Sequence, residues 1–463
     1  MEAKFRIEKD SLGEVKVPID ALYGAQTMRA VENFPISGIK FSRPFIKAIG
    51  FIKKTSAKVN ERLDLIPSDV SKYIRLACDD IISGKLDDQF PLDIYQTGSG
   101  TSTNMNANEV IANIANKIAN DSTKIHPNDH VNFGQSSNDV IPTAIRIAAY
   151  LEAKQHLIPA LEYAKAAFIT KGQELSDIVK TGRTHLMDAM PVTFGQVFSG
   201  YARQLELGIE RINSALTRLS ELPQGGTAVG TGINTHPDFP KMFAEEISDL
   251  TNEKFIESLN HFEAQSTVDA PVELSSILKT IAVSLLKIVN DIRWMNSGPN
   301  CGLGEIKLFA LQPGSSIMPG KVNPVIEEST AMVCAQVIGY DSSVSIAGLS
   351  GNFELNVMLP LVAHCILESI KILGNALRNL ADRSILKLIV RKEHIKSLID
   401  KNPILVTSLN PIIGYDAAAK IAKRAFAENR SLKEVAKEMS DISEEELEKA
   451  LDPIGMTKGG FSK

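Results

Sequence analysis

The feature that most constrains this chain is a long series of apolar helical segments between about residues 138 and 390. In residues 275–295, apolar side chains recur every three or four positions, at 277, 278, 281, 285, 288, 289 and 292, which predicts a helix. Further apolar residues at 282, 283 and 286 leave that helix little polar surface. Residues 310–369 hold only six charged side chains in sixty positions. One subunit can hardly bury several such helices alone, so we expect an oligomer whose core is a shared helix bundle.

The sequence changes character twice along its length, which indicates three domains. The first part mixes helical patterns with turn signals, such as a helix over 68–83 that Gly84 is expected to end. The central part is almost entirely helical in pattern. In the last part charge returns, and Ser431 and Ser443 each precede a glutamate by three positions, as in a capping box. We therefore expect a mainly α fold with domains at residues 1–136, 137–390 and 391–463.

Charge and cysteine usage argue against several classes of protein. The net charge is −5, whereas a nucleic-acid-binding protein usually carries a basic face. The four cysteines lie far apart and form no CxxC pair, which suits free thiols in a reducing compartment better than a zinc site or an iron–sulfur cluster. The N-terminal stretch MEAKFRIEKDSLGE does not resemble a secretory signal, and we expect no run of apolar residues to approach membrane-spanning length. A cytoplasmic protein with no membrane partner is expected.

Two polar clusters stand out in the first third of the chain. TGSGTSTNMNANEV, residues 97–110, reads either as a helix start with redundant caps or as a donor-lined anion site at a helix N-terminus. HPNDHVNFGQSSNDVIPT, residues 126–143, reads as a turn followed by a helix start. Taken alone, the plain turn and cap is the better interpretation of the second cluster. Its serines and Asn138 could also direct donors at a carboxylate.

Two further clusters contain titratable residues. TGRTHLMDAMPVTFGQ, residues 181–196, places His185 among apolar residues, where a lone histidine is more often a satisfied core residue than a catalyst. GSSIMPGKVNP, residues 314–324, combines two glycines, two serines and two prolines with Lys321 and Asn323. A linker rarely separates two strongly apolar helices, so a functional loop is favoured there. The four clusters together supply many neutral donors, one lysine and one histidine, without a phosphate-binding loop or a dinucleotide-binding motif. This set of residues suits acid–base chemistry on a small dianion without a cofactor.

The loop sequence GSSIMPGKVNP resembles the signature of the fumarase/aspartase superfamily of lyases. The other motifs resemble class II fumarase, the iron-independent kind, from about residue 6 to past residue 424. These motifs are TGSGTSTNMNANEV, HPND, QSSNDVIPTA, GRTHL, GGTAVGTGINTHPDF, GNFELNV and LVTSLNPIIGYDAAAKIAKRA. The resemblance implies a three-domain fold whose long central bundle forms a core of twenty helices in a homotetramer. Each active site would be shared by three subunits.

The implied activity is fumarate hydratase, the reversible hydration of fumarate to (S)-malate in the tricarboxylic acid cycle. It proceeds by acid–base catalysis through an aci-carboxylate carbanion, without a cofactor or a metal. Aspartase (aspartate ammonia-lyase) is the alternative, although it typically has glutamine where this chain has His185, and a different residue pair within GAQT at 24–27. A purely structural relative is the third reading, but no position matched to the catalytic pattern is missing.

The resemblance also implies roles for individual residues. Ser315 matches the catalytic serine and His185 the residue that handles the leaving hydroxyl. Glu328 matches the carboxylate partner of that histidine, and only the match distinguishes it from Glu327. HPND matches a second dicarboxylate site of open function, at His126, Asn128 and Asp129. The implied substrate-binding residues are Ser99, Thr101, Ser136, Ser137, Asn138, Thr184, Ser316, Lys321 and Asn323.

Overall fold

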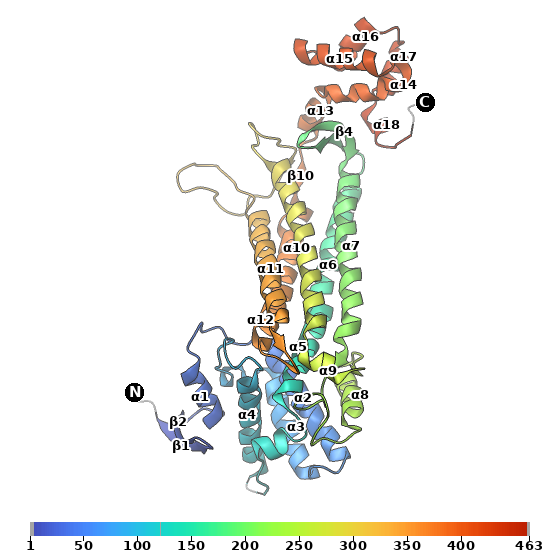
Figure 1. Cartoon of the computed structure of the whole chain (residues 1–463). Coiled ribbons are helices and arrows are strands. Elements are labelled where there is room, and N and C mark those ends of the chain that lie inside the picture. The colour runs from blue at the N-terminus through green and yellow to red at the C-terminus, as the bar shows by residue number, and fades with distance from the viewer. Residues whose placement is uncertain (1–3, 121, 461–463) are drawn as a thin grey trace. The chain divides into compact units, whose positions relative to one another are not determined.

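The computed structural model describes residues 4–120 and 122–460, and that part of the chain is mainly α-helical with only short two-stranded sheets (Figure 1). The predicted fold class is therefore confirmed. The chain forms two compact units. The first comprises Met1–Pro159, Gly208–Ala282 and Val333–Gly374, and the second comprises Ala160–Leu207, Val283–Met332 and Asn375–Lys463. The division into three domains by sequence character stays a prediction.

The first unit is organised around α2 (Arg43–Arg62). Phe45, Ile49 and Ile52 are completely buried on one face of this helix, which packs against α3 and α5. The predicted end of α3 is confirmed, because Gly84 has a φ of 90° and forms a left-handed cap. The elements that lie wholly in this unit are β1 (Phe5–Asp10), β2 (Gly13–Pro18), α1 (Ala25–Asn33), α2, α3 (Ser68–Ser83), η1 (Asp87–Gln89), α4 (Thr101–Ala119), η2 (Pro127–Val131), α5 (Ser137–Glu152), η3 (Ala153–Leu157), β5 (Glu221–Leu222), α8 (Phe239–Thr251), β6 (Ile256–Glu257), α9 (His261–Ser266), β8 (Gly351–Asn352) and β9 (Leu355–Asn356).

The second unit contains a β-hairpin, an aromatic cluster and the C-terminal helices. Phe168 and Phe194 each pack edge to face against Phe198, and their ring centroids lie 5.7 and 6.0 Å from the centroid of Phe198. Both predicted capping boxes are confirmed, at Ser431 and Ser443. The elements that lie wholly in this unit are β3 (Val179–Thr184), β4 (Met187–Thr193), β7 (Ile306–Lys307), η4 (Ile385–Lys387), β10 (Ile389–Val390), α13 (Lys392–Asp400), η5 (Pro403–Leu409), α14 (Asn410–Ile413), α15 (Tyr415–Glu428), α16 (Leu432–Met439), α17 (Glu444–Ala450) and α18 (Pro453–Met456).

Long helices contribute residues to both units and include the predicted helix over 275–295. They are α6 (Ile158–Glu174), α7 (Phe194–Leu219), α10 (Asp269–Asn296), α11 (Val325–Leu349) and α12 (Leu359–Arg383). Two segments, Val325–Leu349 and Leu359–Lys387, are long and apolar enough to cross a membrane by length and composition alone. The expectation that no segment reaches this length is therefore wrong. Core helices of a bundle meet the same criteria, and 28% and 61% of the respective apolar windows are buried within the chain.

The connections between helices depart from the expected pattern in two places. A hairpin of β3 and β4 interrupts the stretch predicted to be helical. The loop 314–324 was expected between two apolar helices, but only α11 borders it directly, since α10 already ends at Asn296. Gly298 and Gly304, with φ values of 106° and 55°, adopt backbone conformations that a helix cannot continue through.

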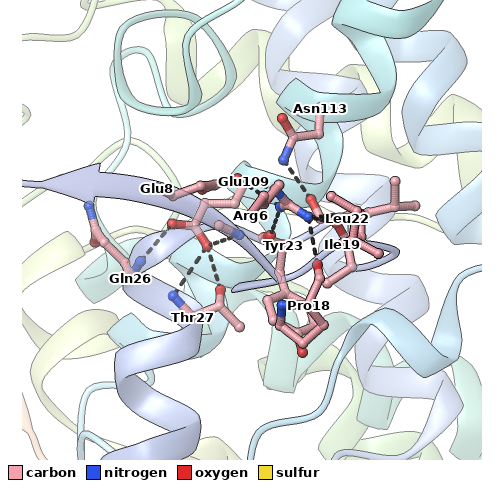
Figure 2. Close-up of polar contacts among 12 residues, drawn as sticks. Arg6, Glu8, Pro18, Ile19, Leu22, Tyr23, Gln26, Thr27, Glu109 and Asn113 are labelled. Atoms are coloured by element: carbon pink, nitrogen blue, oxygen red, sulfur yellow. Dashed lines mark hydrogen bonds and ion pairs between the residues drawn. The ribbon is translucent and has the colours of Figure 1, made fainter. Parts of the chain in front are cut away.

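The N-terminal arm, residues 5–27, is held to α4 by Glu109 and braced internally by Arg6 of β1 (Figure 2). The Glu109 carboxylate accepts hydrogen bonds from the backbone amides of Gly24, Gln26 and Thr27 at 2.8–3.2 Å. The Arg6 guanidinium donates to backbone carbonyls of residues 18–23, at 2.7–3.3 Å. Burial raises the pKa of Glu109, and the amides that it accepts from act in the opposite direction. The GAQT stretch is thus anchored through its main chain.

Candidate active site

The first predicted donor cluster lies at the start of α4, where the chain turns tightly. Gly100 precedes the helix with a φ of 72°, and a Cβ on Gly98 would lie only 1.8 Å from the Val357 carbonyl oxygen. The hydroxyls of Ser99 and Thr101 bond to each other at 2.8 Å. They therefore do not act as redundant caps of α4, and the positive end of the helix is left to other partners.

Hydrogen bonds connect α4 to the start of α5. Asn104 Nδ2 donates to Ser137 Oγ at 3.0 Å. The predicted helix start at Ser136 is confirmed, since its side chain takes part in a capping box. Asn138 Nδ2 donates to the Ala228 carbonyl at 2.8 Å, which ties the start of α5 to the glycine-rich loop 225–235. The structure thus joins the first two predicted clusters within one unit.

Asp139 fastens this arrangement from the inside. Its buried carboxylate accepts hydrogen bonds from the amides of Ser136, Gly225 and Thr227 at 2.9–3.0 Å. Burial raises the pKa of Asp139 to about 6, while the three amides favour the charged form. The start of α5 is consequently tied to main-chain amides of the loop 225–235 through the Asp139 carboxylate.

The HPND stretch forms η2, a π-helical turn that His126 caps. His126 Nδ1 accepts from the amides of Asn128 and Asp129 at 3.3 and 3.2 Å, so the predicted turn is confirmed. Asn128 and Asp129 also line a hollow of about 380 Å³, together with Ser136. The second predicted site and one of the predicted substrate-binding serines therefore border the same space. Dicarboxylate binding at η2 stays a prediction.

In the second unit, His185 occupies the turn of the β3–β4 hairpin. Thr184 pairs with Met187, so His185 and Leu186 form a two-residue turn with φ values of 54° and 62°. This left-handed conformation is what a type I′ turn requires, although it is costly for residues other than glycine and asparagine. Both side chains are exposed. The apolar surroundings expected for His185 are therefore not observed, because the hairpin turns its tip outward.

Three charged residues brace that hairpin at its base. Glu305 is completely buried, and its Oε1 accepts from Arg183 Nη1 at 2.9 Å. Lys180 Nζ lies 3.4 Å from Glu305 Oε2 and donates to the Thr181 carbonyl at 2.7 Å. Burial lowers the pKa of Lys180, and the charge of Glu305 opposes this shift. The hairpin that carries His185 is thus tied to a buried carboxylate.

The loop 314–324 closes on itself. Gly314 donates its amide to the Lys321 carbonyl at 2.8 Å, and its own carbonyl accepts from Asn323 Nδ2 at 2.7 Å. The Ser315 hydroxyl oxygen accepts from the amides of Ile317 and Met318, at 3.3 and 3.0 Å. Two amide donors on one hydroxyl oxygen stabilise negative charge there. This environment is suited to a serine that must lose its proton.

Lys321 and its neighbours border two open spaces. A hollow of about 440 Å³ is lined by Ser315 and Lys321, and a larger one of about 920 Å³ by Lys321, Asn323 and Arg293. Ser316 and Lys321 are exposed. The loop therefore presents a positive charge and several neutral donors to solvent, as a dianionic ligand requires.

The two neighbouring glutamates at the start of α11 have different surroundings. Glu327 is buried and accepts a short hydrogen bond from the Ser384 hydroxyl, and burial raises its pKa. Glu328 is half-buried, and no hydrogen bond or ion pair engages its carboxylate within residues 4–120 and 122–460. Glu327 is thus committed to holding the helix start, whereas Glu328 is free to act on another group.

The predicted residues fall into two sets, one in each unit. No hydrogen bond or ion pair among the described residues joins the His185 turn to the loop 314–324. Sequence reasoning missed the buried supports Lys53, Glu109 and Glu305. Lys53 could have been suspected, because it falls on the same face of α2 as the apolar residues at 45, 49 and 52.

Comparison with known proteins identifies the family. A family model described as "Lyase" matches residues 13–339, and one described as "Fumarase C C-terminus" matches residues 405–458. A Xylella fastidiosa protein named fumarate hydratase class II is 55% identical over 458 residues, which is 99% of this chain and 96% of the relative. The chain belongs to the class II fumarate hydratase family.

Further relatives of this fumarate hydratase family member agree along the whole length. A Pseudomonas aeruginosa protein named fumarate hydratase class II 2 is 52% identical, covering 98% of this chain and 99% of the relative. The crystal structure of class II fumarase from Schistosoma mansoni superimposes with a TM-score of 0.96 at 38% identity, covering 98% of this chain and 99% of that one. The resemblance inferred from the motifs is confirmed, and the aspartase alternative is not favoured.

Proposed function

We propose that this chain catalyses the reversible addition of water to fumarate, giving (S)-malate. The observation that carries the proposal is full-length identity of 55% to a protein named class II fumarate hydratase. The roles given below to individual residues are part of the proposal. They rest on the match to the family pattern and on the local geometry of each residue.

Substrate binding is assigned to neutral donors at two helix starts, in the β3–β4 hairpin and in the loop 314–324, and to one lysine. In this proposal the carboxylates of the substrate meet the N-termini of α4 and α5, where the helix dipole favours an anion. The mutual hydrogen bond of Ser99 and Thr101 can be exchanged for bonds to a ligand at little cost. The proposed donors are Ser99, Thr101, Ser136, Ser137, Asn138, Thr184, Ser316, Lys321 and Asn323.

Ser315 is proposed to accept the proton from C3 of malate. A serine is a weak base, and it needs stabilisation of its oxyanion to act as one. The amides of Ile317 and Met318 already point at the Ser315 oxygen, and Lys321 lines the same hollow. The carbanion that forms is an aci-carboxylate, whose added charge preformed donors stabilise by roughly 3–4 kcal/mol each.

His185 is proposed to give a proton to the hydroxyl group that leaves C2 as water, and to take a proton from water when it adds to fumarate. Its exposed position at a hairpin turn allows a neighbouring chain to complete its surroundings. Glu328, the unengaged carboxylate of the pair at the start of α11, is the proposed partner. A carboxylate next to an imidazole orients the ring and raises its basicity.

A homotetramer with active sites shared by three subunits is part of the same proposal. It is supported by α11, where Met332, Ile346 and Leu349 are 68%, 61% and 86% exposed in a single chain. Apolar surface of this kind requires a partner. A cytoplasmic location is also proposed, and it is supported by four free cysteines, three of them buried.

The test is an assay of purified protein with fumarate in buffer free of ammonium, following the loss of ultraviolet absorbance of the conjugated diacid. The expected product is malate, identified by chromatography. Loss of absorbance only after ammonium is added, with aspartate as product, would instead support an ammonia-lyase. No reaction in either buffer would contradict both activities.

A further inference from the structure

A fully buried lysine lies behind the start of α5. Lys53, on α2, has no exposed surface. Its ammonium donates to Asn132 Oδ1 at 2.9 Å and to Gln135 Oε1 at 3.1 Å. Burial lowers the pKa of Lys53 to about 7, and the charge of Asp139 acts in the opposite direction. Burying a lysine side chain costs free energy unless its polar group is hydrogen-bonded. The partners of Lys53 therefore indicate what its burial achieves.

Asn132 is the point where these contacts converge. Its Oδ1 accepts from Lys53 Nζ and also from the Nδ2 atoms of Asn104 and Asn108, both at 3.2 Å. Its own Nδ2 donates to the Gln135 carbonyl at 3.0 Å. One amide side chain therefore connects α2, α4 and the segment that follows η2.

Gln135 carries the connection to the proposed substrate donors. It directly precedes Ser136, and its Nε2 donates to the carbonyls of Val131 and Phe133 at 3.1 and 3.3 Å. Asn132, Gln135 and Ser136 all line the hollow of about 380 Å³. Lys53 thus stands directly behind the wall of that hollow, and removing it would leave the side-chain oxygen of each of these two wall residues without one of its donors.

We propose that Lys53 is a positioning residue, which acts through Asn132 and Gln135 to hold the donors at the start of α5 where a dicarboxylate binds. This inference rests on the proposed function, because it assigns Lys53 to the same substrate site. Lys53 does not touch the ligand. Its Nζ donates to two amide side chains, and these hold the main chain from which Ser136, Ser137 and Asn138 project.

The experiment compares Lys53→Met with Lys54→Met in steady-state hydration of fumarate. The two lysines are adjacent on α2, but Lys54 is partly exposed and pairs with Asp79 at 2.5 Å. For Lys53→Met we expect KM to rise about tenfold while kcat changes less than about threefold, because we assign the donors at the start of α5 to uniform binding, which holds substrate and transition state alike. For Lys54→Met we expect both constants to stay at their wild-type values.

This division between KM and kcat separates positioning from general support of the fold. A merely structural lysine would lower the fraction of active enzyme, and hence the apparent kcat, at an unchanged KM. An unchanged KM in folded Lys53→Met protein would overturn the proposal. If wild-type protein does not hydrate fumarate, the proposed function fails instead.

A second variant keeps the test informative if Lys53→Met does not fold. Gln135→Leu removes one of the two acceptors and leaves Lys53 bonded to Asn132. A KM raised by about threefold or more, at near-normal kcat, supports the proposal. A KM equal to that of the wild type in this variant overturns it.

Discussion

Replacing Glu305 with glutamine removes the carboxylate that two cations share at the base of the β3–β4 hairpin. Glu305 and Lys180 are buried, and Arg183 is mostly so. Taking one partner out of a buried ion pair typically costs ~3–5 kcal/mol, because the remaining charge stays buried and unpaired. We expect a loss of that size in the free energy of unfolding.

The same substitution should also reduce activity, since the hairpin carries His185 at its turn. A displacement of about 1 Å in a catalytic group can reduce the rate by ~100-fold. We therefore expect Glu305→Gln to lower kcat by roughly 10–100-fold, measured with saturating fumarate. Thermal and denaturant unfolding of the same preparations give the stability change.

Two further variants serve as controls for Glu305→Gln. The double variant Lys180→Met with Glu305→Gln no longer buries the unpaired ammonium, so it should recover part of the lost stability. Asp80→Asn removes the partner of Lys85 in an exposed pair and should change stability by less than about 0.5 kcal/mol. A loss below about 1 kcal/mol in Glu305→Gln, or a double variant no more stable than the single one, would refute the reasoning.

Three other outcomes are expected. His185→Asn should lower turnover by ~100-fold or more while the assembly measured by light scattering persists; near-normal turnover would exclude the assigned role. Glu109→Gln replaces one acceptor oxygen with a donor, so the amides of Gly24, Gln26 and Thr27 should exchange with deuterium at least about tenfold faster, whereas unchanged exchange contradicts the anchoring role. The pKa of Lys53 is lowered to about 7 in the folded chain, so between pH 7 and 8.5 the unfolded chain binds more protons and stability should rise with pH. Lys53→Met should lack this rise in the denaturation midpoint, and a rise of equal size in both proteins would contradict the assignment.

Local signals in the sequence predicted the elements that depend on a few neighbouring residues. Gly84 ends a helix because its left-handed φ suits glycine, and Ser431 and Ser443 form capping boxes because a glutamate follows each at the right spacing. The same is true of Ser136, which forms a capping box because Asp139 follows it by three positions at the start of α5.

The hairpin at His185 could not be predicted in this way. Type I′ turns are usually marked by Asn-Gly, and His-Leu gives no such signal. The strand that leads into the turn is braced from outside the hairpin, by Glu305 far along the chain. Likewise, the choice between Glu327 and Glu328 depends on Ser384, which the local sequence does not contain.

The N-terminal arm is attached to α4 through its main chain, so its conformation depends little on which side chains it carries. Apart from the Thr27 hydroxyl and the Glu8 carboxylate, the hydrogen-bond partners of Glu109 and Arg6 among the described residues are main-chain groups of residues 18–27. The identity of Ala25 or Gln26 therefore contributes little to holding the arm (Figure 2). Mutation at these two positions can therefore proceed without dismantling the arm. The GAQT stretch, where aspartases typically carry a different residue pair, is thus a place where chains of this family can diverge while keeping a common framework.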